Sequence, residues 1–177
     1  MVTAYTLLIA LVAVERVAEL LVARSHLAWA RARGGVEYGR AHYPWLVLAH
    51  VGLLVAAPLE VWLLHRPFLP ALGRPMLAVV LAAQALRWWC VAALGRQWNT
   101  RVVVVPGLPL VRHGPYRWLR HPNYVAVVAE GIALPLVHSA WLTAIAFTMA
   151  NAVLLRTRVR VENAALAHAD HRHAARP

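Results

Sequence analysis

Residues 76–94 decide the fold of this chain, and they read MLAVVLAAQALRWWCVAAL. Arg87 is their one charged side chain, and their length approaches the roughly 20 apolar residues that an α-helix needs to cross a bilayer. Four more apolar runs surround this stretch, at residues 2–22, 45–64, 124–137 and 140–155. With 61% hydrophobic residues and a mean hydropathy of +0.56, the 177-residue chain predicts an all-α, polytopic membrane protein with about five transmembrane helices.

The last two apolar runs are shorter than the others and are joined around Pro135. We therefore expect them to form a short helical hairpin, followed by a C-terminal helix on the cytoplasmic side. Full and partial crossing of the bilayer by this hairpin both stay open. The loops and the C-terminal segment are too short to bury an independent core. Residues 1–177 are thus expected to form a single integral-membrane domain.

The net charge of +11 comes from arginine, and its distribution alternates along the chain. Connections after the first and third runs and the C-terminal segment are rich in arginine, whereas the connections between them hold only Arg66 and Arg74. This is the positive-inside pattern, which predicts an N-terminus outside and a C-terminus in the cytoplasm. This pattern accounts for the positive charge without nucleic acid, so no nucleic-acid partner is expected. Membrane lipids are the expected partners.

Ionisable residues interrupt the apolar runs at six positions. Two interpretations stay open: an ion-pair network that holds helices together, with Arg87 offsetting a glutamate of a neighbour, or a cavity that holds polar groups of a substrate. The charges in the first run also favour a retained helix over a cleaved signal peptide. The six residues are Glu15, Arg16, Glu19, Glu60, Arg87 and Glu130.

Cysteine and tryptophan add two further expectations. Cys90 is the only cysteine, so an intrachain disulfide and a metal-thiolate cluster are excluded. Trp98, Trp118 and Trp141 are interpreted as residues of the interfacial aromatic belt. Trp88 and Trp89 lie deeper in their run and are candidates for lining a lipid-like pocket or facing a sulfonium.

The candidate site is the segment Arg120-His121-Pro122-Asn123-Tyr124, between a polar connection and an apolar run. A residue before proline is biased away from helix, so His121 should be extended and Pro122 should be the first helical residue. Free amides at a helix start attract anions, and His121 and Tyr124 add polar groups about one turn apart. Together they indicate a site for a charged small molecule.

The segments on either side of this motif contribute further candidates. An extended backbone beside Leu110 and Val111 offers amide and carbonyl groups to a flat heterocycle, and Gly114-Pro115 predicts a turn that returns Tyr116 toward the fourth run. Helical spacing puts Arg158 and Glu162 on one face, where Arg158 suits an anionic acceptor and Glu162 a ribose or an ammonium. The spacing of His168, Asp170, His171 and His173 matches no standard zinc pattern, so no metal site is predicted.

These motifs, in this order, resemble the isoprenylcysteine carboxyl methyltransferase family. The resemblance rests on Gly114-Pro115-Tyr116-Arg117, on residues 120–124, and on Arg158 followed by Glu162 and Leu166. It covers about residues 97–166, the half expected to form the cofactor site. The N-terminal half, with Glu15-Arg16 and residues 34–43, resembles a bacterial branch associated with type III polyketide synthases and the methylation of alkylpyrones.

The resemblance implies S-adenosylmethionine as the methyl donor, bound at the cytoplasmic face of a bacterial cell membrane, and a lipophilic small-molecule or prenylated acceptor. Arg158 then matches the arginine near the methyl-transfer centre and is the candidate catalytic residue. Asn163 stands where the family commonly has a second glutamate, which bears on how the C-terminal segment closes over the cofactor. The matching cofactor-binding residues are Leu110, Val111, Gly114, Tyr116, His121, Tyr124 and Glu162.

Two other functions are kept as alternatives. One is a membrane reductase that uses a nicotinamide cofactor, because sterol reductases resemble this C-terminal architecture. The other is a non-catalytic membrane scaffold whose buried charges only pair helices. The sequence contains no Gly-x-Gly-x-x-Gly fingerprint of a soluble dinucleotide site.

Overall fold

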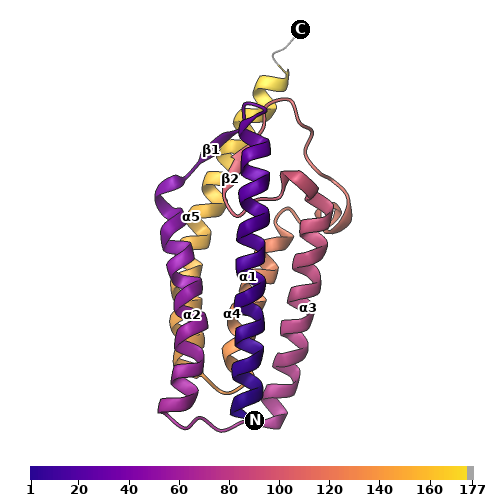
Figure 1. Ribbon diagram of the computed structural model, residues 1–177. Coiled ribbons are helices and arrows are strands. Elements are labelled where there is room, and N and C mark those ends of the chain that lie inside the picture. The colour runs from indigo at the N-terminus through magenta and orange to yellow at the C-terminus, as the bar shows by residue number, and fades with distance from the viewer. Residues whose placement is uncertain (175–177) are drawn as a thin grey trace.

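The computed structural model of the protein describes the backbone of residues 1–174 and the side chains through residue 167. Over this part of the chain, five α-helices run along the long axis of an elongated molecule, with the N-terminus at one end and the C-terminal segment projecting from the other (Figure 1). Three short 3-10 helices and a two-stranded sheet lie among the connections at the C-terminal end. The α-helices are α1 (Val2–Arg31), α2 (Tyr43–Leu63), α3 (Pro70–Leu94), α4 (Pro122–Leu136) and α5 (Trp141–Ala174).

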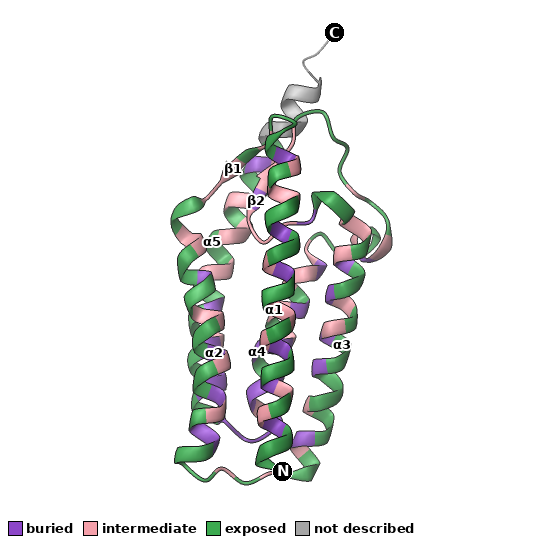
Figure 2. Cartoon of the chain, in the orientation of Figure 1, coloured by how far each residue is buried: buried purple, intermediate pink, exposed green. Residues whose placement is uncertain are grey.

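The outer surface of the helices is apolar where a lipid bilayer would contact it. Exposed residues face outward along each helix in Figure 2, and many of them are large and hydrophobic, such as Leu7, Leu48, Leu81 and Met149. Three helical segments are long and apolar enough to cross a membrane: Arg40–Leu63, Pro70–Gln97 and Trp141–Ala167. The protein is therefore an all-helical integral membrane protein.

The two last helices differ from the expected short hairpin. α4 is short and apolar, with 15 residues, but α5 is a continuous helix of 34 residues. The expected fifth span and the expected separate C-terminal helix are thus one element, because nothing between Trp141 and Ala174 is a glycine or a proline that would end it. The turn between α4 and α5 follows Pro135 and includes Ser139, whose φ of 57° is left-handed.

A hydrophobic core fills the half of the bundle that is farther from the sheet. It joins side chains of α1, α2, α3 and α4, among them Ile9, Val61, Val80 and Leu134. α4 and α5 approach closely at Gly131, where an added Cβ would lie 2.0 Å from the Phe147 ring. A side chain at this position would push α4 away from α5.

The ionisable residues of the apolar runs form a buried network, as one of the two interpretations predicts. Arg87 of α3 binds Glu19 of α1 through Nε at 2.5 Å and through a second guanidinium nitrogen at 2.6 Å. Arg16 binds Glu19 at 2.7 Å and both carboxylate oxygens of Glu130 at 3.2 Å, and so ties α1 to α4. Glu15 also lies within 3.4 Å of Arg16.

Glu60 has a different role, because it caps the start of α5. Its carboxylate accepts hydrogen bonds from the backbone amides of Leu142 and Thr143 and from the Thr143 hydroxyl, at 2.7 to 3.1 Å. Arg66 binds the same carboxylate at 2.9 Å. These contacts satisfy amides that a helix leaves without partners in its first turn.

A small antiparallel sheet fastens the first connection to the third. β1 (Val36–Tyr38) pairs with β2 (Val102–Val104), with Glu37 opposite Val103. Glu37 is surrounded by the guanidinium groups of Arg101 at 2.6 Å, Arg31 at 3.2 Å and Arg40 at 3.3 Å. Burial works to raise the pKa of Glu37, but the hydrogen bonds from these arginines outweigh it and lower the pKa.

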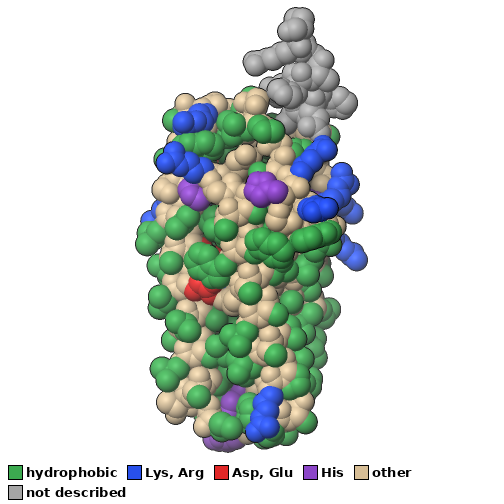
Figure 3. All heavy atoms as spheres, turned by 90° about the vertical axis from the view of Figure 1, so that its right-hand side faces the viewer, with side chains coloured by type: hydrophobic (Ala, Val, Ile, Leu, Met, Phe, Trp, Pro, Cys, Tyr) green, Lys and Arg blue, Asp and Glu red, His purple; other side chains and the backbone are tan. Residues whose placement is uncertain are grey.

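Arginine side chains gather toward the end of the molecule that carries the sheet and the C-terminal segment. Figure 3 shows them there on one face, above a body covered mainly by hydrophobic side chains, with a single basic patch at the opposite end. This distribution agrees with the charge asymmetry from which the cytoplasmic side was predicted. Which side of a membrane the arginine-rich end occupies stays a prediction.

Candidate functional site

The site begins at the start of α4, whose local structure follows from its proline. Pro122 is the first residue of α4, and His121 before it is non-helical, with φ −134° and ψ 61°. The predicted start of α4 at Pro122 is confirmed, and His121 lies outside the helix as expected, but its ψ of 61° is not the extended backbone that was predicted. The non-helical backbone turns the His121 ring back over α4, where it stacks on Tyr124 with ring centroids 5.3 Å apart and planes inclined by 23°.

Tyr124 joins two residues of α5. Its hydroxyl group donates a hydrogen bond to Glu162 and accepts one from Arg158 Nε at 2.9 Å. The Arg158 guanidinium carbon also lies 5.7 Å from the centre of the Tyr124 ring. Arg158 and Glu162 share one helical face, as their spacing predicts, and that face packs against the start of α4.

His121 completes this cluster. Its Nδ1 lies 3.5 Å from Glu162 Oε1, and its Nε2 lies 3.1 Å from Asn163 Oδ1. A carboxylate and an amide oxygen only accept hydrogen bonds, so the ring satisfies both contacts when both nitrogens carry hydrogen. The hydrogen bond with Glu162 accordingly raises the pKa of His121 above its ordinary value.

The cluster of His121, Tyr124, Arg158, Glu162 and Asn163 is hereafter called the polar cluster. It is open to solvent, because the side chains of His121 and Glu162 are 19% and 28% exposed. A small polar molecule can therefore reach its carboxylate and imidazole groups. A carboxylate, an imidazolium and a guanidinium within one site are suited to a ligand with charges of both signs.

The other predicted site residues lie in the connection between α3 and α4. Tyr116 is in the 3-10 helix Gly114–Arg117, where its hydroxyl contacts Cys90 and burial raises its pKa. Gly114 has a φ of 59°, and an added Cβ would lie 3.2 Å from Trp89 Nε1. Among the described residues, no hydrogen bond or ion pair joins Leu110, Val111 or Gly114 to the polar cluster.

A cavity of about 160 Å³ extends from the polar cluster into the bundle. Tyr124, Asn123 and Arg158 line it at the cluster, and Arg16, Glu19 and Arg87 line it deeper between the helices. Its walls are largely apolar and come mainly from α2, with Leu46, Val47, Val51 and Leu54, and from Leu20, Val127 and Leu155. The buried ion pairs thus agree with both interpretations of the sequence in part, because they join helices and also line a cavity.

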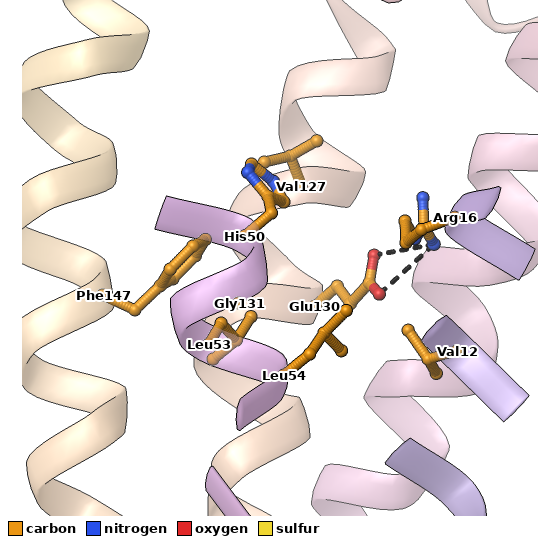
Figure 4. Close-up of a pocket in the computed structure, with 9 residues that line it drawn as sticks. All are labelled: Val12, Arg16, His50, Leu53, Leu54, Val127, Glu130, Gly131 and Phe147. Atoms are coloured by element: carbon orange, nitrogen blue, oxygen red, sulfur yellow. Dashed lines mark hydrogen bonds and ion pairs between the residues drawn. The ribbon is translucent and has the colours of Figure 1, made fainter. Parts of the chain in front are cut away.

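A much narrower hollow adjoins this cavity. Figure 4 shows Arg16 reaching across it to Glu130, and His50 of α2 facing Phe147 of α5. Its volume is about 10 Å³, room for about one water molecule. Arg16, His50, Leu54 and Val127 line both spaces, so the hollow is the deep end of the same opening.

The tryptophan residues depart from their expected roles. Trp98 is only 2% exposed and lines the cavity, so its assignment to the interfacial belt is wrong. Trp118 and Trp141 are exposed, as residues of such a belt would be. Trp88 and Trp89 are each 48% exposed and do not line the cavity, because the face of α3 that meets it carries Arg87 instead.

Several lining residues gave no signal in the sequence. Asn151 and His50 are single polar residues in apolar helices, and Tyr43 meets the third connection through its hydroxyl, 3.2 Å from that of Thr100. Asn123, by contrast, belongs to the segment that the sequence singled out. Among the side chains described, no group of three or more His, Cys, Asp or Glu residues is arranged to hold a metal ion. His168, Asp170, His171 and His173 lie outside the described side chains.

Comparisons with known proteins agree with this arrangement. A model of the isoprenylcysteine carboxyl methyltransferase (ICMT) family matches residues 76–168, which include α4, the polar cluster and most of α5. An uncharacterized protein of Bacillus subtilis (strain 168), YpbQ, is 40% identical over 92% of this chain and 96% of its own length. An uncharacterized protein of Haemophilus influenzae (strain ATCC 51907 / DSM 11121 / KW20 / Rd) is 27% identical over 77% of this chain and 80% of its own. The chain therefore belongs to the ICMT family of membrane methyltransferases.

Proposed function

We propose that this protein is an S-adenosylmethionine-dependent O-methyltransferase that acts at the cytoplasmic face of the membrane on a lipophilic anionic acceptor. The observation that carries the proposal is the junction of a solvent-exposed polar cluster with a largely apolar cavity at Tyr124 and Arg158. A water-soluble, charged donor and an oily acceptor need such a junction, because each must arrive from a different solvent. Residues 1–177 act as one domain in this proposal, with the cofactor site in about residues 97–166.

The residues present fit the donor. Glu162 offers a partly exposed carboxylate for an ammonium or for ribose hydroxyl groups, and the His121 and Tyr124 rings stack beside it. The irregular connection that contains Leu110, Val111, Gly114 and Tyr116 would supply backbone groups and an aromatic ring for the heterocycle. When bound, S-adenosylmethionine would supply a methyl group carried on a cationic sulfur. After transfer of the methyl group, the rest of the donor leaves as a neutral thioether.

Arg158 has the catalytic role of holding the acceptor oxygen. Its Nε is engaged by Tyr124, which fixes the guanidinium between the polar cluster and the cavity. A prenylcysteine-like carboxylate or an alkylpyrone-like enol is already anionic at neutral pH, so its oxygen supplies the electron pair and no residue has to remove a proton. Orientation and exclusion of water then account for the catalysis that the protein provides.

Calorimetry on the purified protein in detergent tests the cofactor. We expect binding of S-adenosylmethionine, no binding of a reduced nicotinamide cofactor, and loss of donor binding in His121→Ala. His65→Asn is the matched control, because it removes a histidine from the α2–α3 turn at the opposite end of the bundle and suits the positive φ there. Binding of the nicotinamide cofactor instead of the donor would favour the reductase.

Transfer of a labelled methyl group into the lipid phase tests the reaction. We expect labelled product when a bacterial lipid extract is the acceptor, and much less product from Arg158→Gln, which removes the guanidinium charge and leaves a neutral polar side chain. Folded protein that binds neither cofactor and transfers no label would support the scaffold alternative.

A further inference from the structure

The cavity holds polar groups that the reaction proposed above does not use. Asn151 of α5 lines it and is 3% exposed, and its Oδ1 has no hydrogen-bond partner among the described residues. Asn123 Oδ1, at the start of α4, is likewise buried without a partner and lines the same cavity. An unsatisfied buried acceptor of this kind costs about 1–3 kcal/mol, so it calls for a ligand or water in the cavity.

His50, which lines the same cavity as Asn151, provides a second hydrogen-bond acceptor. Its ring lies 5.3 Å from the ring of Phe147, one turn before Asn151 on α5. His50 Nδ1 lies 2.8 Å from the Leu46 carbonyl oxygen, which can only accept, so Nδ1 donates that hydrogen bond. In the neutral ring Nε2 is then left as a hydrogen-bond acceptor for a hydroxyl or N–H group.

The surroundings offer an anion no unpaired positive charge at this depth. The adjacent ion-pair network contains three carboxylates, of Glu15, Glu19 and Glu130, and two guanidinium groups, of Arg16 and Arg87. It has one carboxylate more than it has arginines, so both guanidinium groups are already bound and neither is free to pair with a negatively charged group. Apolar side chains such as Leu155 lie between this region and Arg158.

We infer that Asn151, together with His50, is a second recognition point of the acceptor cavity and binds a neutral hydroxyl or N–H group of the methyl acceptor. The inference rests on the proposed function, which assigns Arg158 to the reacting oxygen. Asn151 lies seven residues before Arg158 on α5, so the two points are about two helical turns, roughly 10 Å, apart along the helix. The acceptor class is an amphipathic molecule with an anionic oxygen at one end and a hydrogen-bond donor farther along an apolar body.

The inference gives Asn151 a role in specificity. In the free protein water can satisfy the Asn151 amide, and a ligand group that repeats the hydrogen bond of that water replaces it at little cost. An acceptor that offers only hydrocarbon there leaves the amide unsatisfied and is disfavoured. Sites built to bind a hydroxyl group reject the analogue that lacks it far more strongly than apolar pockets reject an added group.

The test compares palmitic acid with a positional series of monohydroxylated palmitic acids as acceptors for the labelled methyl group. We expect at least one hydroxylated acid to have a kcat/KM at least about tenfold above that of palmitic acid in the wild-type protein. In Asn151→Leu this preference should fall to near unity, while donor binding by calorimetry stays unchanged. Thr148→Val, which removes a hydroxyl that donates to Ala144 on the same helix outside the cavity, should keep the preference.

The outcomes separate the two proposals. Methylation of the acids with no preference for any hydroxylated one overturns the second recognition point and leaves the methyltransferase standing, and so does a preference that Asn151→Leu retains. If Asn151→Leu does not fold, the wild-type preference decides alone. Failure of the wild-type protein to bind S-adenosylmethionine or to methylate any acid or lipid extract overturns the proposed function, and the recognition point with it.

Discussion

Arg158 and Glu162, one turn apart on α5, are joined through the hydroxyl group of Tyr124 on α4. The Tyr124 hydroxyl oxygen thus links Arg158, which lines the cavity, to Glu162, which is partly exposed to solvent. The geometry makes Tyr124 a positioning residue for both charged groups, and the groups are linked in the order imidazole, carboxylate, phenol, guanidinium.

Tyr124→Phe removes this connection and keeps the ring. We expect kcat/KM to fall about tenfold to hundredfold, because hydrogen bonds to charged groups contribute about 1.5–3 kcal/mol each. Methyl transfer and donor binding measured on the same sample give the result. Tyr5→Phe is the matched control, since the Tyr5 hydroxyl is buried at the other end of the bundle without a hydrogen-bond partner among the described residues. Equal activity of the two variants would contradict the positioning role.

The raised pKa of His121 predicts a pH dependence of stability. A raised folded-state pKa means that the stabilising contact with Glu162 is fully present below the ordinary histidine value of 6.5 and is lost as pH rises through the raised value. The difference in melting temperature between wild type and His121→Gln should therefore shrink as pH rises from about 6 to about 9. In a Glu162→Gln background this pH dependence should largely disappear, because the cause of the shift is gone.

The buried network has one more carboxylate than it has arginines, so neutralising Glu19 and neutralising Glu130 should affect stability differently. Glu19→Gln leaves Arg87 without its carboxylate and should destabilise strongly, since breaking a buried ion pair costs about 3–5 kcal/mol. Glu130→Gln leaves two carboxylates for two arginines and should change the melting temperature little. Thermal unfolding of both variants in the same detergent provides the measurement. Equal losses would show that Glu130 is as necessary to the network as Glu19.

The lowered pKa of Glu37 predicts how the stability of the small sheet changes at acidic pH. Its lowered pKa means that its ion pairs are present above the ordinary glutamate value of 4.5 and are lost as pH falls through the lowered value. Glu37→Gln should speed hydrogen exchange of the β1 and β2 amides at neutral pH, where wild type is protected. Arg33→Gln should not, because Arg33 stacks on Trp29, 4.5 Å from its ring, rather than on the sheet. Unchanged exchange in Glu37→Gln would mean that the backbone pairing alone holds the strands.

The sequence predicted those features that depend on local residue types. Pro122 determines where α4 begins and hence where His121 lies, and the spacing of Arg158 and Glu162 places them on one face. An arginine in an apolar helix needs a carboxylate, so the partnership of Arg87 with a neighbouring glutamate was also predictable. Each of these follows from a few residues and one rule of backbone or charge.

Features that depend on distant segments were not predictable in this way. β1 and β2 have three residues each, and nothing in Val36 or Val104 alone indicates that they pair across 68 positions. The change from apolar to arginine-rich sequence after Leu155 marks a change of solvent, but it leaves the backbone of α5 unbroken. A lone Asn151 among apolar residues is likewise compatible with a helix contact or a cavity wall until the neighbouring helices are in place.

The continuity of α5 has a mechanical consequence. Asn151, Arg158 and Glu162 belong to one rod without a hinge, so the rod moves as a whole: a slide along its axis shifts all three by the same amount and in the same direction. The lipid-buried stretch cannot relocate while the water-facing stretch stays in place. A ligand that shifts α5 at Asn151 therefore also shifts Arg158 and Glu162, because the helix between them is stiff.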